Sequence, residues 1–453
     1  MNNKKKKRFE FSELKSNSRD WNLESIVLIF MSLANSLTLA LSLILSSYFT
    51  FNLLETISYK AQDGWCLEEK AGFGVHCFGD FGFPITQLLS TNDVYNLTPP
   101  SNYTPWVTII FSIFKGIYLT YGWNMAIVLY SLLLVIPIWI TIIDALRNVQ
   151  LKIRIGLTIC LGLFSPALLM IIDRGNSVGL IVLPLYMFFK KFQNNSDLYP
   201  IFWGVVAIAI RPQSCIILIF LFICRRYSEF FRIIIASSFI YLLGFYLLSS
   251  KNFMGNLTGF LNSLIGYSQL SLGGIWPYNY SIANAFGVLN RYASLGLDNS
   301  VLSLLGTLVS LLFILVVGLV SKYSSLSLAT KQSTIFIWLL PFGFLLPSVS
   351  YGYYTCFGLL AMLILVREKL TPQQLGFGNL TIGFVFLSVL SLTLTLVFVP
   401  ASLLYPDTKA NLLQVANPGL WIITYSCLSI RLLFLLKDLR SRRNRTKLKA
   451  KLT

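Results

Sequence analysis

Residues 76–106 read HCFGDFGFPITQLLSTNDVYNLTPPSNYTPW. This stretch is polar, is rich in turn-forming residues, and carries two carboxylates, Asp80 and Asp93. It follows a long apolar segment at residues 26–54, in a chain that is apolar over most of its length. A loop in this place can hold an acidic side chain at the mouth of a membrane-embedded cavity. We predict that Asp80 is that side chain.

The composition indicates a membrane protein. Of the 453 residues, 55% are hydrophobic and only 12% are charged, and the mean hydropathy is +0.69. Soluble domains carry about 25% charged residues, so this chain has too few charges to cover a water-facing surface. Many of its apolar runs approach the roughly 20 residues that cross a hydrocarbon core. We predict an all-α polytopic membrane protein.

The formal net charge of +18 is concentrated in the two ends of the chain and in short loops. The basic clusters occupy residues 4–8, 147–154, 190–191, 225–232 and 437–451. This distribution is typical of cytoplasmic segments, which also attract anionic lipid headgroups. We therefore expect the lipid bilayer, and no nucleic acid, as the partner of these charges. Both termini should be cytoplasmic, in a plasma (inner) membrane.

When the basic segments are placed on the cytoplasmic side and the apolar runs are counted as crossings between the two sides, the chain forms a bundle of about twelve membrane helices. Residues 1–24 and 437–453 form basic cytoplasmic tails, and residues 25–436 form one transmembrane domain. Its extracytoplasmic loops lie at about 55–122, 249–300 and 400–418. The first span, 26–54, is too long for the apolar region of a cleavable signal peptide. The later spans are expected at residues 123–146, 155–172, 178–189, 231–248, 301–320, 334–349, 353–366, 380–399 and 420–436.

Three segments do not fit a simple span. Residues 106–118 are short and carry Lys115, and if they crossed the membrane the basic loop 147–154 would lie outside. They are therefore expected to form an interfacial or re-entrant helix on the outer side, as is the apolar segment 253–272. Residues 201–224 have basic flanks on both sides and Arg211-Pro212-Gln213 at the centre. This pattern predicts a hairpin of two short helices, with Arg211 at its outer turn or at depth.

The cysteines and the glycosylation triplets carry little functional signal. Cys66 and Cys77 both fall in the first outer loop, where a disulfide between them could form. The sequence has no CxxC motif and no Cys/His cluster, so no metal site is expected. Residue usage rich in Lys, Asn, Ile, Phe and Ser favours a bacterial source, in which N-x-S/T triplets bear no glycans. These triplets begin at Asn96, Asn102, Asn256 and Asn279.

Ionisable groups at membrane depth are costly, so each is a candidate functional residue. The predicted topology places one such set on the outer side, namely Asp80, Asp93, Asp173, Arg174, Arg211 and Arg291, together with the polar Asn279. Carboxylates facing arginines suit an anionic amphiphile such as a lipid phosphate, because the arginine fork pairs two phosphate oxygens at once. A separate carboxylate can act as general base on a hydroxyl.

Each of these residues also has a purely structural interpretation. Asp173 and Arg174 could cap a helix end, and Arg211-Pro212 could mark a kink from which the arginine snorkels. Asp80 and Asp93 could be turn residues. The sequence leaves both interpretations open.

Three groups of motifs resemble a known enzyme family. They are Asp80-Phe81, Asp93-Val94-Tyr95 and Tyr103-Thr104-Pro105 in the first loop; Arg174-Gly175-Asn176 with Gly204 and Arg211-Pro212; and Asn279-Tyr280-Ser281. Their order and shared outer placement resemble the GT-C type glycosyltransferases that use polyprenyl-phosphate sugars, most closely the bacterial mannosyltransferase family 87. The resemblance covers about residues 75–295, and the C-terminal third matches only in hydropathy.

The resemblance implies an inverting hexosyltransferase of GT-C-like fold. Its donor would be a polyprenyl-phosphate-linked hexose such as mannose, and its acceptor a glycolipid or glycan. No nucleotide sugar, metal or cofactor is implied. Asp80 would be the catalytic base, and the substrate-binding residues would be Arg211, Arg174, Asp173, Asn176, Asn279, Asp93 and Tyr103. Arg211-Pro212 replaces the family's Lys-Pro, which keeps the charge. With His76 as the only histidine, no second catalytic histidine carries over from the family.

Two other functions remain as alternatives. A polymerase or ligase of lipid-linked saccharides would favour arginine-rich outer loops, of which this chain has few. A transporter or flippase would favour broken helices at matching positions in two halves of the chain. The sequence shows one broken element, at Arg211-Pro212, without a counterpart in the second half.

Overall fold

The computed structural model describes residue 33 and residues 78–91, 93–97, 101–162, 165–193, 198–270, 279–324, 326–347, 349–370 and 413–452. These residues are helical almost throughout, and their only bridge pairing joins Asn279 to Tyr351. Five helical segments among them are long and apolar enough to cross a membrane: Trp123–Ala145, Tyr227–Leu248, Asn299–Tyr323, Leu328–Leu345 and Val415–Ser441. The described part of the chain therefore fits an all-α membrane protein.

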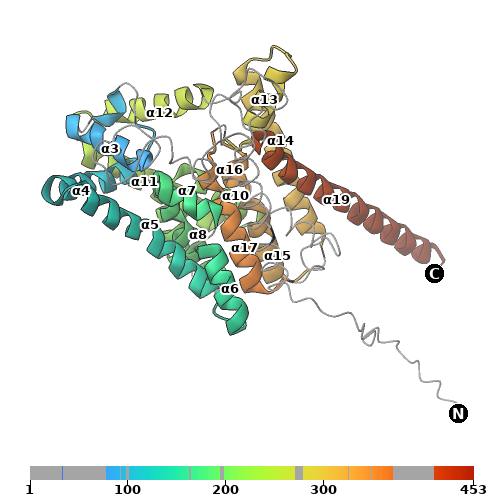
Figure 1. The fold of residues 1–453 in the computed structure, drawn as a ribbon. Coiled ribbons are helices and arrows are strands. Elements are labelled where there is room, and N and C mark those ends of the chain that lie inside the picture. The colour runs from blue at the N-terminus through green and yellow to red at the C-terminus, as the bar shows by residue number, and fades with distance from the viewer. Residues whose placement is uncertain are drawn as a thin grey trace, which may run out of the picture.

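Helices from the two predicted long loops gather at one end of the helical body, which we call the α3 end. They are α3 (Gly79–Ser90), the 3-10 turn η2 (Val94–Asn96), α12 (Phe253–Leu270) and α13 (Ile282–Tyr292). Figure 1 shows α3, α12 and α13 at this end and α6 at the opposite end. Helix α12 lies directly on η2, since a Cβ at Gly259 would be 2.6 Å from the Tyr95 carbonyl oxygen.

The first half of the body continues from α4, which packs against α3 and α5. Its elements are α4 (Pro105–Tyr121), α5 (Trp123–Ala145), α6 (Leu151–Gly162), α7 (Pro166–Arg174), η3 (Ser177–Ile181), α8 (Val182–Gln193), α9 (Leu198–Ile210), η4 (Pro212–Cys215), α10 (Ile216–Ile223) and α11 (Tyr227–Leu248). The second half comprises α14 (Asn299–Tyr323), α15 (Leu328–Leu339), α16 (Phe342–Leu345), η5 (Gly352–Thr355), α17 (Cys356–Glu368) and α19 (Leu413–Leu452).

Helix α17 is the centre of the core. Every residue from 356 to 366 is buried, and the helix packs against α5, α8 and α15. A helix that is apolar on all sides is expected to be surrounded by protein or by lipid. Here the neighbours are other helices, so the segment predicted as span 353–366 is an interior helix rather than a lipid-facing one.

The hairpin predicted over residues 201–224 has a clear geometry. Lys191, near the end of α8, lies over the ring of Tyr199 at the start of α9, 5.1 Å from its centroid. Arg226, just after α10, lies 5.0 Å over the ring of Phe192, also near the end of α8. The start of α9 and the end of α10, which are the ends away from the hairpin turn, therefore meet at the end of α8. The turn itself, η4, lies near the start of α8. We call the end of the body where α8 finishes the basic end.

Some predicted spans differ from the helices. The span 155–172 is divided between α6 and α7, because Pro166 starts a new helix and cannot continue the preceding one. Span 178–189 begins as η3, and α19 continues as a helix to Leu452, through the predicted tail. Several predictions lie outside the described residues: span 26–54 except for residue 33, span 380–399, the tail 1–24, His76, and the pair Cys66 and Cys77.

Candidate functional site

Asp80 lies in the first turn of α3, where the helix dipole favours a negative charge. The next residue, Phe81, is fully buried and stacks on Tyr130, with ring centroids 4.2 Å apart and an interplanar angle of 16°. Neighbouring residues of a helix point in different directions, so this anchor turns Asp80 away from the aromatic core. The Asp80 side chain keeps 15% of its surface exposed.

Gly175 ends α7 and brings its two neighbours onto Asp80. It adopts the left-handed conformation, with φ of 61°. A Cβ at this position would lie 2.7 Å from Cδ1 of Phe78 and 2.9 Å from Cβ of Phe81. Glycine is therefore required here both by the backbone conformation and by the close approach of α3. Because of this approach, Arg174 and Asn176 both reach the Asp80 carboxylate.

The carboxylate of Asp80 is held by two donors. Nη2 of Arg174 donates to Oδ1 at 2.8 Å, and Nδ2 of Asn176 donates to Oδ2 at 2.6 Å. The side-chain oxygen of Asn176 in turn accepts hydrogen bonds from Nη2 of Arg211 and from the Val178 amide, each at 2.9 Å. Asn176 is only 1% exposed. It therefore connects Asp80 to Arg211 and fixes the positions of both.

Arg211 is a buried cation at the tip of the α9–α10 hairpin, with 5% exposure. Its guanidinium lies over the rings of Tyr103 and Tyr354, with Cζ 4.8 and 5.9 Å from their centroids, as in cation–π contacts. The Tyr103 hydroxyl donates to the Asp80 carbonyl at 2.9 Å. Thr104 donates through Oγ1 to the Ile210 carbonyl at 3.1 Å, which ties the hairpin tip to the start of α4.

The charges of this group do not balance. We call Asp80, Tyr103, Arg174, Asn176 and Arg211 the Asp80 cluster. It contains one carboxylate and two guanidinium groups, which leaves one positive charge without a carboxylate inside the cluster. Burial lowers the pKa of Arg174, but the charge and the hydrogen bond of Asp80 outweigh it, so its pKa is raised and the group stays charged.

Two other predicted residues make structural contacts. Asp93 is the residue before η2, and its carboxylate accepts a hydrogen bond from Nδ2 of Asn256 at 3.4 Å. This bond joins η2 to α12. Oδ1 of Asn279 accepts from the amides of Ser281 and Ser350, at 3.3 and 2.9 Å. These contacts fasten the segment that leads into η5. Neither residue has a described contact with Asp80.

Asp173 lies in the last turn of α7, and its side chain is outside the described set. The structure thus brings five of the predicted site residues together and leaves Asp93 and Asn279 at the supporting elements around them.

Tyr354 and Gln213 were missed by the sequence argument. Gln213 directly follows Arg211-Pro212, and its Nε2 donates to the Tyr354 hydroxyl at 3.2 Å. Tyrosines at predicted span ends are usually assigned to the membrane interface. Tyr354 is instead only 5% exposed, next to the buried Arg211. The position of Gln213, two residues after the candidate residue Arg211, was the one signal available in the sequence.

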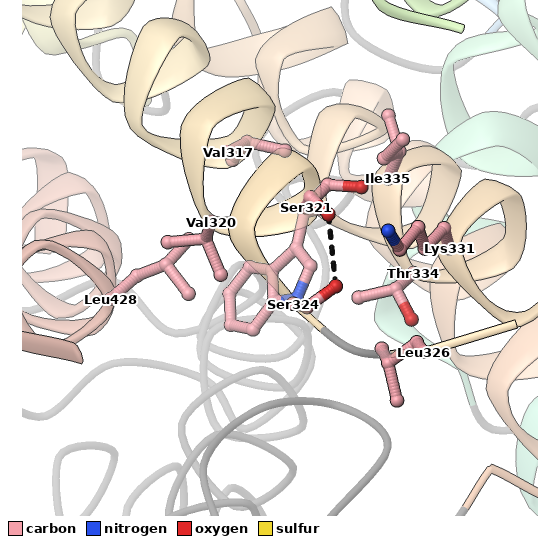
Figure 2. A pocket seen from close by; sticks show the side chains of 10 residues that line it. Val317, Val320, Ser321, Ser324, Leu326, Lys331, Thr334, Ile335 and Leu428 are labelled. Atoms are coloured by element: carbon pink, nitrogen blue, oxygen red, sulfur yellow. Dashed lines mark hydrogen bonds between the residues drawn. The ribbon is translucent and has the colours of Figure 1, made fainter. Parts of the chain in front are cut away.

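A separate hollow lies between α14, α15 and α19 (Figure 2). Apolar side chains form most of its wall, with Ser321, Ser324, Lys331 and Thr334 grouped on one side. Oγ of Ser324 donates to the Ser321 carbonyl at 2.9 Å. No residue of the Asp80 cluster lines this hollow. Within the described ranges, no group of three or more His, Cys, Asp or Glu side chains could hold a metal ion.

The fold and the cluster together define a helical protein with helices able to cross a membrane and a mixed arginine–aspartate site. Comparisons of the chain with known protein families, with curated proteins and with solved structures found no match.

Proposed function

We propose that this protein is an integral membrane glycosyltransferase. It moves a hexose, mannose being the first choice, from a polyprenyl-phosphate donor to a glycolipid or glycan acceptor at the extracytoplasmic face. The proposal includes a GT-C-like bundle of about twelve membrane helices, of which the five described candidate spans are a part. The resemblance of the motifs around Asp80, Arg174 and Arg211 supplies the reaction class.

One observation carries the proposal: the five described residues of the Asp80 cluster carry one more positive charge than negative, and Arg211, one of the two arginines, is buried. A desolvated guanidinium is costly unless an anion compensates it. A lipid phosphate ester of a sugar is a monoanion, and so it would balance the cluster. A nucleotide sugar carries a diphosphate with two charges and would overcompensate it. The lipid part of the donor would remain among the membrane-facing helices.

The positions of the charged groups are compatible with the following reaction. Each oxygen of the Asp80 carboxylate keeps a further lone pair after binding Arg174 and Asn176. One of these lone pairs accepts the acceptor's hydroxyl proton while the hydroxyl oxygen attacks the anomeric carbon. The bond between that carbon and the phosphate oxygen breaks, with inversion. The released lipid phosphate keeps the bonding electrons, and Arg211 and Arg174 stabilise its charge.

The test uses purified protein reconstituted in lipid vesicles with radiolabelled polyprenyl-phosphate-mannose. Transfer is measured as label that becomes covalently attached to added glycolipid or glycan acceptors. We expect wild-type protein to transfer label and Asp80→Asn to lose at least about 100-fold in rate. Asp298→Asn is the matched control, because Asp298 is an exposed carboxylate that precedes α14.

The same vesicles separate the proposal from its alternatives. Label that crosses into the vesicle interior without being transferred indicates a transporter or flippase. Label that accumulates as a lipid-linked polymer indicates a polymerase. Either result, or full transfer by Asp80→Asn, contradicts the proposed reaction.

A further inference from the structure

Three buried polar atoms at the hairpin tip have no hydrogen-bond partner in the described part of the chain. They are Nε of Arg211, Oε1 of Gln213 and Oγ of Ser214. Ser214 is fully buried, and Arg211 is nearly so. Buried polar atoms are normally paired, and an unpaired one destabilises the fold. Three such atoms on four consecutive residues indicate a place that is completed by a ligand.

The chemistry of these atoms differs from that of the phosphate-binding side of the cluster. Nε of Arg211 is a donor, Oε1 of Gln213 is an acceptor, and the hydroxyl of Ser214 can be either. A phosphate offers only acceptor oxygens, so it would leave Gln213 Oε1 unpaired. A sugar hydroxyl both donates and accepts, so a ring bearing several hydroxyls can pair with Gln213 Oε1 and Ser214 Oγ, while an oxygen of the adjoining phosphate accepts from Nε of Arg211.

The surroundings also suit a sugar. The Tyr354 hydroxyl accepts from Nε2 of Gln213 and can still donate its own hydrogen. The rings of Tyr353 and Tyr354 lie 5.0 Å apart, and both residues are buried. An aromatic ring has an apolar face bordered by a polar hydroxyl, which matches the C–H face and hydroxyl edge of a pyranose. Gln213 and Arg211 thus both contact Tyr354, Gln213 at its hydroxyl and Arg211 over its ring.

We propose that Gln213, Ser214 and Tyr354 form the subsite that binds the hydroxyl groups of the donor's hexose. This inference rests on the proposed function, in which Arg211 holds the adjoining phosphate. The hairpin tip then has two parts: the Arg211 guanidinium binds the phosphate, and the side chains of Gln213 and Ser214 bind the sugar. Gln213 and Ser214 then determine specificity for a sugar-loaded lipid over a bare lipid phosphate.

The experiment measures binding of two lipids to purified protein in nanodiscs. One is polyprenyl-phosphate-mannose, and the other is polyprenyl phosphate, which lacks the sugar. Gln213→Leu should weaken binding of the mannosyl lipid about tenfold, since a hydrogen bond in a buried site is lost. Ser214→Ala, a smaller change, should weaken it about threefold. Binding of polyprenyl phosphate should stay within about twofold in both variants.

Unchanged binding of polyprenyl phosphate also shows that the variants are folded. Gln150→Leu, at an exposed residue between α5 and α6, is the matched control and should bind both lipids as wild type does. Equal loss for both lipids, or no loss for either, overturns the subsite. Wild-type protein that binds polyprenyl phosphate but gains no affinity from the sugar also overturns the subsite alone. Wild-type protein that binds neither lipid overturns the proposed function as well.

Discussion

At Gly175 the chain turns through a left-handed conformation, and the residues on both sides of it bind Asp80. The cost of a charge among apolar residues pointed to Asp80, Arg174 and Arg211, and the family resemblance added Tyr103 and Asn176. It did not predict their roles relative to one another. Asn176 was expected to touch substrate, yet its side-chain oxygen is occupied by Arg211 and Val178. Such a role depends on distances that spacing along the chain does not determine.

Gly175→Ala should lower the free energy of unfolding by about 1–3 kcal/mol, because the new Cβ meets Phe78 and φ is positive. It should also separate Arg174 and Asn176 from Asp80 and reduce transfer. Thermal unfolding in detergent measures the first effect. Gly116→Ala is the control, since nothing lies within 4 Å of a Cβ there and alanine favours the helix interior. Equal stability of the two variants would contradict the close approach.

Tyr103 allows the contributions of its hydroxyl and its ring to be separated. Tyr103→Phe removes the hydrogen bond to the Asp80 carbonyl but keeps the ring under Arg211. We expect a loss of about 1 kcal/mol in transition-state stabilisation, seen in kcat. Tyr103→Ala also removes the cation–π contact, and it should raise the KM for the donor further. Identical kinetics for the two variants would show that the ring contributes nothing.

At the scale of elements, periodicity and hydropathy located most helices but not their breaks. Helices α5, α11 and α14 coincide closely with predicted spans, because each is a continuous apolar run. The division between α6 and α7 was missed, although Pro166 marks it, because a hydropathy average counts apolar residues and ignores backbone hydrogen bonds. The hairpin at Arg211 was predicted because basic flanks on both sides restrict the path of the chain.

Thr104 holds the hairpin tip in place. Its hydroxyl accepts from the Val107 amide as the N-cap of α4 and donates to the Ile210 carbonyl. Thr104→Ala should therefore cost about 1 kcal/mol of stability and raise the KM for the donor. Thr120→Ala is the control, because Thr120 is exposed and bonds only within its own helix. If Thr104→Ala and Thr120→Ala bind the donor equally, the tether does not position Arg211.

For the whole molecule, the sequence indicated an all-α membrane protein with the candidate site residues on one side. It did not indicate which helices and side chains form the core. The apolar run of α17 did not show that other helices would enclose it, and no local pattern marked Tyr354 as buried. Hydrophobicity alone does not distinguish a helix surrounded by lipid from a helix surrounded by protein. The Gln213–Tyr354 pair also joins residues 141 positions apart, which no local pattern reveals.

The predicted topology has a direct test. Single cysteines at Ser90, at the end of α3, and at Asn148, between α5 and α6, replace exposed residues at opposite ends of the body. In a background without the seven native cysteines, an impermeant maleimide added to intact cells should label position 90 and not position 148. Labelling of both from the same side would contradict the arrangement of the helices across the membrane.

The unbalanced charge of the Asp80 cluster has a thermodynamic consequence. An anion that binds only the folded protein stabilises it by RT ln(1 + [L]/Kd), which is about 2.7 kcal/mol at one hundred times Kd. Polyprenyl phosphate should therefore raise the Tm of the wild-type protein, and Arg211→Met should abolish that rise. Because Arg211 is buried, added salt should screen the effect only weakly. The melting curve of the purified protein thus becomes a screen for its ligand that requires no knowledge of the acceptor.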